Sequence, residues 1–173
     1  MVSVHKHSNL APATTVDPKY RALCKIALEA AKAAFAPISG FAVGAAIQSI
    51  DGQVFTGQNQ EDSAMDSIHA EIAATIQWNA AGEPKISAIA IVGFRFWPIE
   101  NRKAVTTPCG RCRQWLYEAI VRSNSHPKII CANGELSKLE IFEMKELLPD
   151  AFSLEAALYE NWYKKMRPKL QSM

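Results

Sequence analysis

The segment from Ile86 to Val92 limits most strongly what this chain can fold into. It is apolar at every position except Ser87, and it lacks the alternation of polar and apolar side chains that marks a strand with one face in water. A continuous apolar run of this kind is typical of a strand inside a sheet that is covered on both faces. We therefore expect a sheet with this segment near its centre and helices on both sides.

Four segments have apolar residues at the spacing of an amphipathic helix. The first follows Asp17-Pro18, a favourable N-cap residue with proline at the first helical position. Ile68, Ile72 and Ile76 are expected to form the buried face of the second helix. The other three helices are expected to begin at Asp66 or Ser67, at Thr107-Pro108 and at Ser153.

Two pairs, Asp51-Gly52 and Asn133-Gly134, predict β-hairpins, because these residues supply the positive φ angles of a two-residue turn. The expected strands are 43–50 and 53–56 in the first hairpin, and 128–132 and a segment from 135 in the second. The order of elements predicts a three-layer α/β/α sandwich around a five-stranded mixed sheet. This domain is expected to span residues 17–153, between a flexible N-terminal arm at 1–16 and a C-terminal helix with a basic tail at 154–173.

Composition excludes several classes of function. A chain of 173 residues with 19 basic and 17 acidic side chains is one domain without a general field for nucleic acid. The longest apolar stretch, 86–94, falls far below the roughly 20 residues that span a bilayer, and residues 1–16 lack the apolar core of a secretory signal. Four cysteines are too few for a disulfide scaffold. We therefore predict a cytoplasmic protein with reduced thiols, and neither nucleic acid nor a membrane as its partner.

Two of the expected helix starts carry residues typical of metal chemistry. His69 and Glu71 lie at one start, and Cys109 and Cys112 lie at the other. A Cys-x-x-Cys pair in the first turn of a helix can place both sulfur atoms on one ion, and the positive helix end favours thiolates. With His69 the pair makes three zinc-type ligands and leaves the fourth tetrahedral position for water, as in catalytic sites. Glu71 is then expected to reach that water rather than the metal.

Other interpretations stay open for these residues. The Cys-x-x-Cys pair is also typical of a redox dithiol or a structural zinc clip. An acidic residue such as Glu71 is common early in a helix because of the helix dipole. His5, His7 and His126 are expected to be surface residues, and Cys131 is expected to be a core residue rather than a fourth ligand.

The His-x-Glu and Pro-Cys-x-x-Cys elements together resemble the signature of zinc deaminases. Four segments are similar to segments of the cytidine deaminase family: 39–46 to Ser-x-Phe-x-Val-Gly-Ala-Ala, 57–61 to Gly-x-Asn-x-Glu, 108–114 to Pro-Cys-Gly-x-Cys-Arg-Gln, and 147–152 to Leu-Leu-Pro-x-x-Phe. The resemblance runs from about residue 17 to residue 153. It implies the cytidine deaminase-like fold and a zinc-dependent aminohydrolase with one Zn²⁺ per subunit.

The resemblance also implies which residues carry out the reaction. His69, Cys109 and Cys112 are the implied zinc ligands, and zinc makes a bound water reactive near neutral pH. Glu71 is implied to take a proton from this water and donate one to N3 of the pyrimidine, after which the oxygen attacks C4. The same carboxyl group is then implied to deliver a proton to the departing ammonia. The predicted reaction converts cytidine and deoxycytidine to uridine and deoxyuridine with release of ammonia, as in pyrimidine salvage.

Five further residues are implied to bind the substrate. Asn59 and Glu61 match positions that hydrogen-bond the ribose hydroxyls, and Phe41 matches a residue that packs against the pyrimidine ring. Backbone groups near Ala70 and Thr107 are implied to meet the base. Taken without the resemblance, Asn59 and Glu61 are typical of a polar loop after a strand, and Phe41 is typical of a structural position in a sheet.

The second hairpin separates two branches of deaminases. As families, the deaminases of adenosine in tRNA and of cytidine in polynucleotides place a crossover helix between their last two strands, which then run parallel. Asn133-Gly134 leaves no room for a helix, so these strands are expected to be antiparallel, as in the branch that acts on free nucleosides. A small-molecule nucleoside is therefore the predicted partner.

Two departures from the family pattern leave specificity open. The loop 59–69 is one residue shorter than in the common small form and has Asp62 where Asn is usual, and the segment 94–106 is longer and brings Arg95 toward the metal-binding helices. The alternative substrate is a modified cytidine or an aminopyrimidine nucleoside antibiotic such as blasticidin S, and the alternative function is a noncatalytic zinc-stabilised binding protein. A single module with extra tails favours a homotetramer over a dimer, with Phe152 and Trp162 near subunit contacts.

Overall fold

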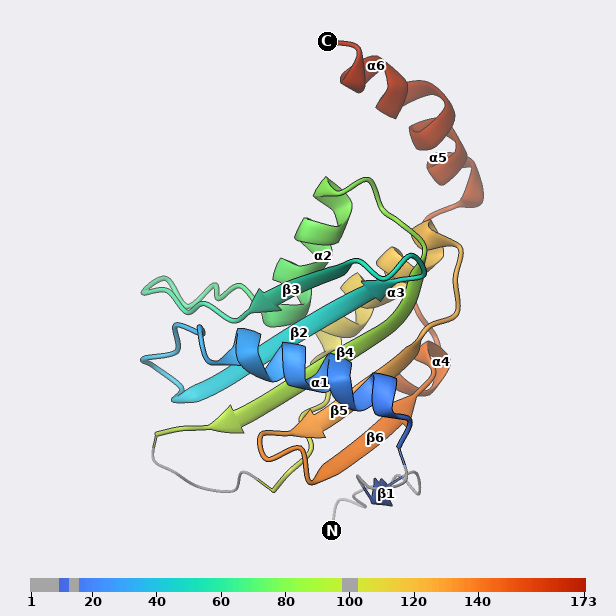
Figure 1. Ribbon diagram of the computed structural model, residues 1–173. Coiled ribbons are helices and arrows are strands. Elements are labelled where there is room, and N and C mark those ends of the chain that lie inside the picture. The colour runs from blue at the N-terminus through green and yellow to red at the C-terminus, as the bar shows by residue number, and fades with distance from the viewer. Residues whose placement is uncertain (1–9, 13–15, 98–102) are drawn as a thin grey trace.

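The computed structural model describes residues 10–12, 16–97 and 103–173 (Figure 1). Among these residues the sheet has six strands, in the spatial order β1-β6-β5-β4-β2-β3. They are β1 (Leu10–Pro12), β2 (Phe41–Ser49), β3 (Val54–Gln58), β4 (Ile86–Arg95), β5 (Lys128–Asn133) and β6 (Lys138–Phe142). β4 and β5 are parallel, and the other neighbouring pairs are antiparallel. The five expected strands form a mixed sheet, and β5 and β6 are antiparallel as predicted.

β1 adds a sixth strand that the sequence did not predict. It lies within the 1–16 arm, pairs with β6 at the edge of the sheet and places Ala11 opposite Leu139. Val16, at the end of the arm, is 6% exposed and packs in the core with Leu23. Three residues are too few to show a periodic pattern, and this strand is defined by backbone pairing with β6. Residues 1–9 and 13–15 of the arm lie outside the described residues.

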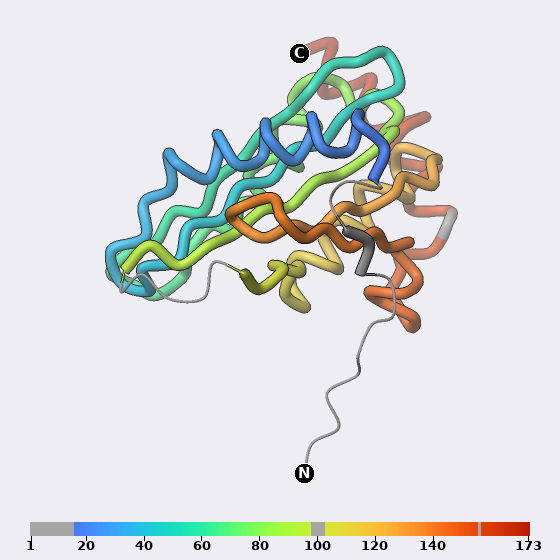
Figure 2. The backbone as a smooth tube through the Cα atoms, turned by 60° about the horizontal axis from the view of Figure 1, so that its bottom comes forward, coloured from blue at the N-terminus to red at the C-terminus, as the bar shows by residue number. Residues whose placement is uncertain are grey.

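Helices cover both faces of the sheet. α1 (Pro18–Ala31) lies on one face, and α2 (Ala70–Ala80) and α3 (Gly110–Ser123) lie on the other (Figure 1). Figure 2 shows α1, in blue, running along the sheet. In β4, Ala90 and Val92 pack toward α1, whereas Ile89 and Ile91 pack toward α2 and α3. The fold is therefore the predicted three-layer α/β/α sandwich, with the apolar strand inside it.

Two glycines let helices approach the sheet closely. A Cβ atom on Gly44 of β2 would lie 2.0 Å from the carbonyl oxygen of Ala27 in α1. A Cβ atom on Gly57 of β3 would lie 2.3 Å from the carbonyl oxygen of Ala70 in α2. Any larger residue would have to push the helix away from the strand. Gly57 thereby determines how closely the first turn of α2 lies on β3.

Both hairpin turns are longer than the predicted two-residue turns. In the first, the N–H of Ser49 donates to the carbonyl of Gln53 (3.0 Å), so three residues form the loop. Gly52 still takes the positive φ expected of it, 89°. In the second, β6 begins at Lys138 rather than at position 135, because the side chain of Asn133 accepts a hydrogen bond from the Lys138 N–H (2.9 Å) and closes a wider turn.

α2 begins later than predicted and buries a different face. The expected N-cap at 66 or 67 is wrong, because Ile68 exchanges two backbone hydrogen bonds with Gln60 (2.9 Å each) and the chain stays extended up to His69. Ile68 and Ile76 are about half exposed, whereas the periodic pattern predicted them to be buried. Small alanine side chains carry much of the buried face, and they give a weak apolar signal. The residues that α2 buries are Ala70, Glu71, Ile72, Ala74, Thr75 and Trp78.

The C-terminal segment is helical and changes its winding along its length. After α4 (Met144–Leu147), α5 (Ala156–Asn161) begins later than the predicted start at Ser153 and continues through a π-helical turn, η2 (Trp162–Met166), into α6 (Arg167–Gln171). Pro168 explains the wider turn, because it has no N–H for the carbonyl four residues earlier and its ring would clash with that carbonyl. No helix among the described residues combines the length and apolar character needed to cross a membrane.

Glu83, in the loop after α2, anchors the C-terminal helices to the domain. Its side chain is 3% exposed, and its backbone has a positive φ of 63°. The carboxylate accepts hydrogen bonds from Arg122 of α3 (2.5 Å), from the Tyr163 hydroxyl (2.6 Å) and from Arg167 (2.9 Å). Two guanidinium groups balance the buried negative charge, so Arg167 of the basic tail has a structural contact.

The contact between Tyr163 and Glu83 predicts an alkaline transition. Burial, followed by the hydrogen bond to Glu83, raises the pKa of Tyr163 from 10.0 to about 12. Because the folded state holds the proton more tightly, this contribution to stability is complete below pH 10 and is lost as the pH rises to about 12. Subtracting the absorbance titration of Tyr163→Phe from that of the native chain should isolate one hydroxyl with a midpoint near 12. A midpoint near 10 would show that the contact does not form.

Candidate active site

The starts of α2 and α3 bring three metal-type ligands together. His69 is the N-cap residue of α2, Cys109 is the N-cap residue of α3, and Cys112 lies in the first turn of α3. Nδ1 of His69 lies 3.4 Å from Sγ of Cys109 and 3.3 Å from Sγ of Cys112, and the three ligand atoms all lie within 4.8 Å of one another. α3 begins at Gly110, later than the predicted Thr107-Pro108. Both helices therefore start directly at the ligand cluster.

These donor atoms fit a zinc ion. Zinc–nitrogen and zinc–sulfur bonds of about 2.0 and 2.3 Å place neighbouring tetrahedral ligands roughly 3.5 Å apart, which matches the separations of His69 from Cys109 and Cys112. Burial, followed by the charge of Glu71, raises the pKa of the Cys112 thiol. The positive helix ends and a bound cation act in the opposite direction and would favour the thiolate. No fourth His, Cys, Asp or Glu ligand joins the cluster among the described residues. Cys131 is fully buried in β5, as predicted for a core residue.

Glu71, the second residue of α2, lies beside the cluster. It is 4% exposed, and burial raises the pKa of its carboxyl group despite the opposing effects of its own backbone N–H, Cys112 and His69. Residues two positions apart, such as His69 and Glu71, do not share a face of a regular helix, but His69 lies before the first helical residue. His69 has extended dihedral angles, with φ −86° and ψ 151°, so it does not follow the helical spacing. A carboxyl group with a raised pKa is suited to accept and return a proton near neutral pH.

Arg113 holds the loop that leads into α3. Its Nε donates to the carbonyl of Pro108 (2.9 Å), and its Nη1 donates to the carbonyl of Leu147 in α4 (2.8 Å). These bonds fix the chain directly before Cys109. We assigned Arg113 no role from the sequence, although its place in the 108–114 segment was an available signal.

One cavity of about 330 Å³ connects the ligand cluster to the substrate-binding residues expected from the sequence. This volume is at the lower end of the range for small-molecule sites, about 300–1,000 Å³. Every site residue predicted from the sequence lines the cavity except Cys112, which is the buried member of the ligand cluster. The lining residues are Ser39, Phe41, Val43, Asn59, Glu61, Ser67, His69, Ala70, Glu71, Thr106, Thr107 and Cys109.

The amide group of Asn59 is fixed by β2. Its Oδ1 accepts from the N–H of Val43 (2.8 Å), and its Nδ2 donates to the carbonyl of Phe41 (2.9 Å). An amide side chain has two acceptor lone pairs and two donor hydrogens. These two bonds therefore leave one acceptor lone pair and one donor hydrogen of Asn59 to bind a ligand in the cavity.

Glu61 places a fixed negative charge in the cavity. Its Oε2 accepts from the N–H of Ile38 (2.7 Å), and both of its oxygens accept from the N–H of Ser39 (3.2 Å each). The Ser39 hydroxyl lowers the pKa of Glu61 more than burial raises it, and the N–H groups of Ile38 and Ser39 lower it further. Glu61 is 8% exposed. The carboxylate is therefore ionised and held in one orientation at neutral pH.

The ring of Phe41 lies over Gly93 of β4. A Cβ atom on Gly93 would lie 3.0 Å from Cε1 of Phe41 and 2.7 Å from Oγ1 of Thr106. Four residues that line the cavity were not predicted from the sequence. The 39–46 segment contains two of them, whereas no sequence signal pointed to the other two. The missed residues are Ser39, Val43, Ser67 and Thr106.

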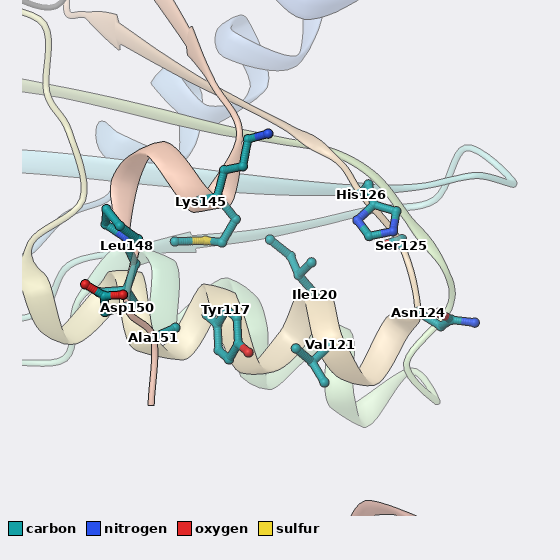
Figure 3. Close-up of a pocket in the computed structure, with 12 residues that line it drawn as sticks. Tyr117, Ile120, Val121, Asn124, Ser125, His126, Lys145, Leu148, Asp150 and Ala151 are labelled. Atoms are coloured by element: carbon teal, nitrogen blue, oxygen red, sulfur yellow. The ribbon is translucent and has the colours of Figure 1, made fainter. Parts of the chain in front are cut away.

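A larger hollow of about 660 Å³ lies elsewhere, along α3 (Figure 3). Tyr117, Ile120 and Val121 line it from α3, and Lys145 and Leu148 line it from the α4 segment. It has no lining residue in common with the 330 Å³ cavity and contains no member of the ligand cluster. We therefore place the candidate active site in the smaller cavity.

Comparisons with known proteins show the family to which the chain belongs. Residues 18–126 match the family model described as the cytidine and deoxycytidylate deaminase zinc-binding region. The cytidine deaminase of Halalkalibacterium halodurans is 32% identical over 136 residues, which cover 77% of this chain and 93% of that protein. The cytidine deaminase of Mycobacterium tuberculosis H37Rv is 33% identical over 130 residues, which cover 75% of this chain and 86% of that protein.

Solved structures extend the likeness to the fold. The crystal structure of cytidine deaminase from Burkholderia pseudomallei has a TM-score of 0.66 and 34% identity, and the match covers 76% of this chain and 97% of that one. The crystal structure of cytidine deaminase from Mycobacterium tuberculosis has a TM-score of 0.63 and 33% identity, and the match covers 80% of this chain and all of that one. The chain therefore belongs to the family of cytidine and deoxycytidylate deaminases and is a hydrolytic aminohydrolase of the cytidine deaminase type.

Proposed function

We propose that this protein converts cytidine and deoxycytidine to uridine and deoxyuridine with release of ammonia, using one zinc ion per chain. The observation that carries the proposal is that the ligand cluster, Glu71, Asn59 and Glu61 all meet at a single 330 Å³ cavity. A cavity of this size fits a free nucleoside rather than a polymer. The antiparallel pairing of β5 and β6 also supports the free-nucleoside branch of the deaminases.

The chain provides a residue for each requirement of the reaction. His69, Cys109 and Cys112 would hold zinc, which when bound supplies a water with a pKa near neutrality. Glu71 accepts one proton from the attacking water and delivers it to N3 of the pyrimidine. It then takes the second proton from the hydroxyl formed at C4 and delivers it to the departing ammonia, which leaves the C4 carbonyl of the product. Glu71 is 4% exposed, so its carboxyl group reaches solvent only through the cavity that it lines. Phe41 packs against the pyrimidine ring, and backbone groups of Ala70 and Thr107 bind the base.

The charge of the cavity favours nucleosides over nucleotides. Glu61 and Asn59 offer acceptors and a donor for the sugar hydroxyls. No lysine or arginine lines the cavity among the described residues. A phosphate group would therefore meet the Glu61 carboxylate with no cation among the described lining residues to offset it. At an effective dielectric constant near 20 and a separation of ~6 Å, two like charges repel by about 2.8 kcal/mol, which corresponds to roughly 100-fold in binding.

A substrate panel tests the proposal. Cytidine, deoxycytidine, deoxycytidylate, cytosine, a substituted cytidine and blasticidin S should be assayed for ammonia release together with zinc analysis. We expect kcat/KM for cytidine and deoxycytidine to exceed that for deoxycytidylate by roughly 100-fold. Turnover of blasticidin S or a substituted cytidine alone would replace the proposed substrate. One zinc per chain without ammonia from any nucleoside would indicate a noncatalytic zinc-stabilised binding protein.

We also infer a cytoplasmic homotetramer that acts in pyrimidine salvage. The thiol groups of Cys109 and Cys112 must stay reduced to bind zinc, and the cytoplasm keeps thiols reduced. Several large apolar side chains of the C-terminal segment are exposed on the single chain, including Phe152 at 72% and Leu158 at 49%. Contacts between subunits would bury them. Mass measurement of the zinc-loaded protein in solution distinguishes a tetramer from a dimer.

A further inference from the structure

The turn formed by residues 38–41 supports two sides of the substrate cavity. Its N–H groups at Ile38 and Ser39 hold the Glu61 carboxylate. The hydroxyl of Ser39 accepts a hydrogen bond from the N–H of Phe41 (3.0 Å), and Phe41 lines the cavity as well. A shift of this turn would move both Glu61 and Phe41. The contacts that hold the turn from outside the cavity therefore affect the geometry inside it.

The end of β4 clamps this turn from outside. Nη1 of Arg95 donates to the carbonyl of Ser39 (3.0 Å). The N–H groups of Phe96 and Trp97 donate to the carbonyl of Gly40 (2.8 and 3.3 Å). Gly40 has a φ of 63°, and a Cβ atom there would lie 1.9 Å from the carbonyl oxygen of Trp97. Only glycine allows the two segments to come this close, and Arg95 supplies a side-chain contact to the clamp.

We propose that Arg95 is a positioning residue, which acts through Ser39 to fix the Glu61 carboxylate for the sugar hydroxyls of the substrate. Ser39 is held on two sides, with its carbonyl bound by Arg95 and its N–H bound by Glu61. Arg95 does not line the cavity, so it orders the sugar-binding group without touching the substrate. The inference rests on the proposed nucleoside substrate, because it assigns Glu61 to the sugar.

Steady-state kinetics with cytidine gives the first test. Arg95→Met keeps the aliphatic stem and removes the donors, and we expect it to raise KM about three- to tenfold, the range for one lost hydrogen bond, with kcat within about twofold. Arg95→Lys can still donate to the Ser39 carbonyl and should restore most of the native KM. Lys32→Ala serves as the control, because it removes only the exposed ion pair between Lys32 and Glu29 at the end of α1. It should leave kcat and KM unchanged. An unchanged KM in Arg95→Met would overturn the proposal.

A double-mutant cycle shows whether Arg95 acts through Glu61. In a Glu61→Ala background the sugar contact is already lost, so adding Arg95→Met should change KM by less than about 1.5-fold. If Arg95→Met raises KM by the same factor in both backgrounds, the two residues act independently and the positioning role is wrong.

Hydrogen exchange of the turn at residues 38–41 tests whether Arg95 and Glu61 hold this turn, and it requires no turnover of substrate. Arg95→Met and Glu61→Ala should each speed exchange of the Ile38 and Ser39 amides, and Lys32→Ala should not. If the native protein deaminates no nucleoside but Arg95→Met speeds this exchange, the proposed substrate is wrong, whereas the contact by which Arg95 holds the turn is supported. If cytidine is turned over while neither KM nor exchange responds to Arg95→Met, the inference about Arg95 fails alone.

Discussion

Replacing Glu71 by glutamine is expected to lower kcat for cytidine by a factor on the order of 10² to 10⁴, while one zinc ion per chain stays bound. Glutamine has nearly the size of glutamate, so the buried position at 4% exposure can accept it. Its amide group cannot take a proton from water and return it to the ring nitrogen or to ammonia. Ammonia release, measured together with zinc content, separates the loss of proton transfer from loss of the metal.

Glu83→Gln is a matched control, because Glu83 is also a buried carboxylate and lies outside the cavity. The change weakens its contacts with Arg122 and Arg167 and should lower the midpoint of thermal unfolding, with kcat within about twofold of native. Two results would contradict the role of Glu71: a native rate in Glu71→Gln, or loss of zinc in the same variant.

Cys112→Ser should reduce the zinc content from about one ion per chain to nearly none and bring turnover down to background. A serine hydroxyl stays protonated near neutral pH and replaces a thiolate, which is the stronger zinc donor. The remaining His69 and Cys109 offer two ligands, and two ligands hold zinc weakly. Because metal binding stabilises the folded state, added zinc should raise the unfolding midpoint of the native protein and not that of the variant.

Cys24→Ala tests whether any buried cysteine has the same effect. Cys24 is fully buried in α1 on the opposite face of the sheet from the ligand cluster. We expect this variant to keep its zinc and its kcat and to lose about 1 kcal/mol of stability from the vacated volume. Full zinc occupancy and native turnover in Cys112→Ser would show that the metal binds elsewhere.

The residue types of the candidate site could be predicted from the sequence because zinc chemistry restricts them. A histidine and a Cys-x-x-Cys pair at helix starts are recognisable without knowing how the helices pack, and the structure brings His69, Cys109 and Cys112 within 4.8 Å of one another. The helix starts themselves were misplaced by a few residues. Ile68 is held in an extended conformation by two backbone hydrogen bonds to Gln60. These bonds can form only when β3 and α2 pack together. A local pattern contains no information about such a pairing.

The contacts of two arginines could not be predicted from the sequence for a similar reason. Arg113 was assigned no role, and Arg95 was expected near the metal-binding helices. Arg113 binds two carbonyl groups, and Arg95 binds the carbonyl of Ser39. Any long cationic side chain in a loop or helix can make such bonds, so the residue type alone does not signal them. β1 was also missed, because its place is decided by the free edge of β6.

By itself the sequence determined the order of the helices and strands from α1 to β6, the burial of β4 on both faces, and the set of chemical groups available for a zinc-dependent reaction. These properties depend on side-chain polarity, on local backbone preference and on donor chemistry, which act over a few residues. The tertiary structure decided where α2 and α3 begin, how the cavity joins the zinc ligands to Asn59 and Glu61, and which groups hold Glu61 in place. Those outcomes depend on distances between segments far apart in the chain, and such distances exist only after the layers have packed.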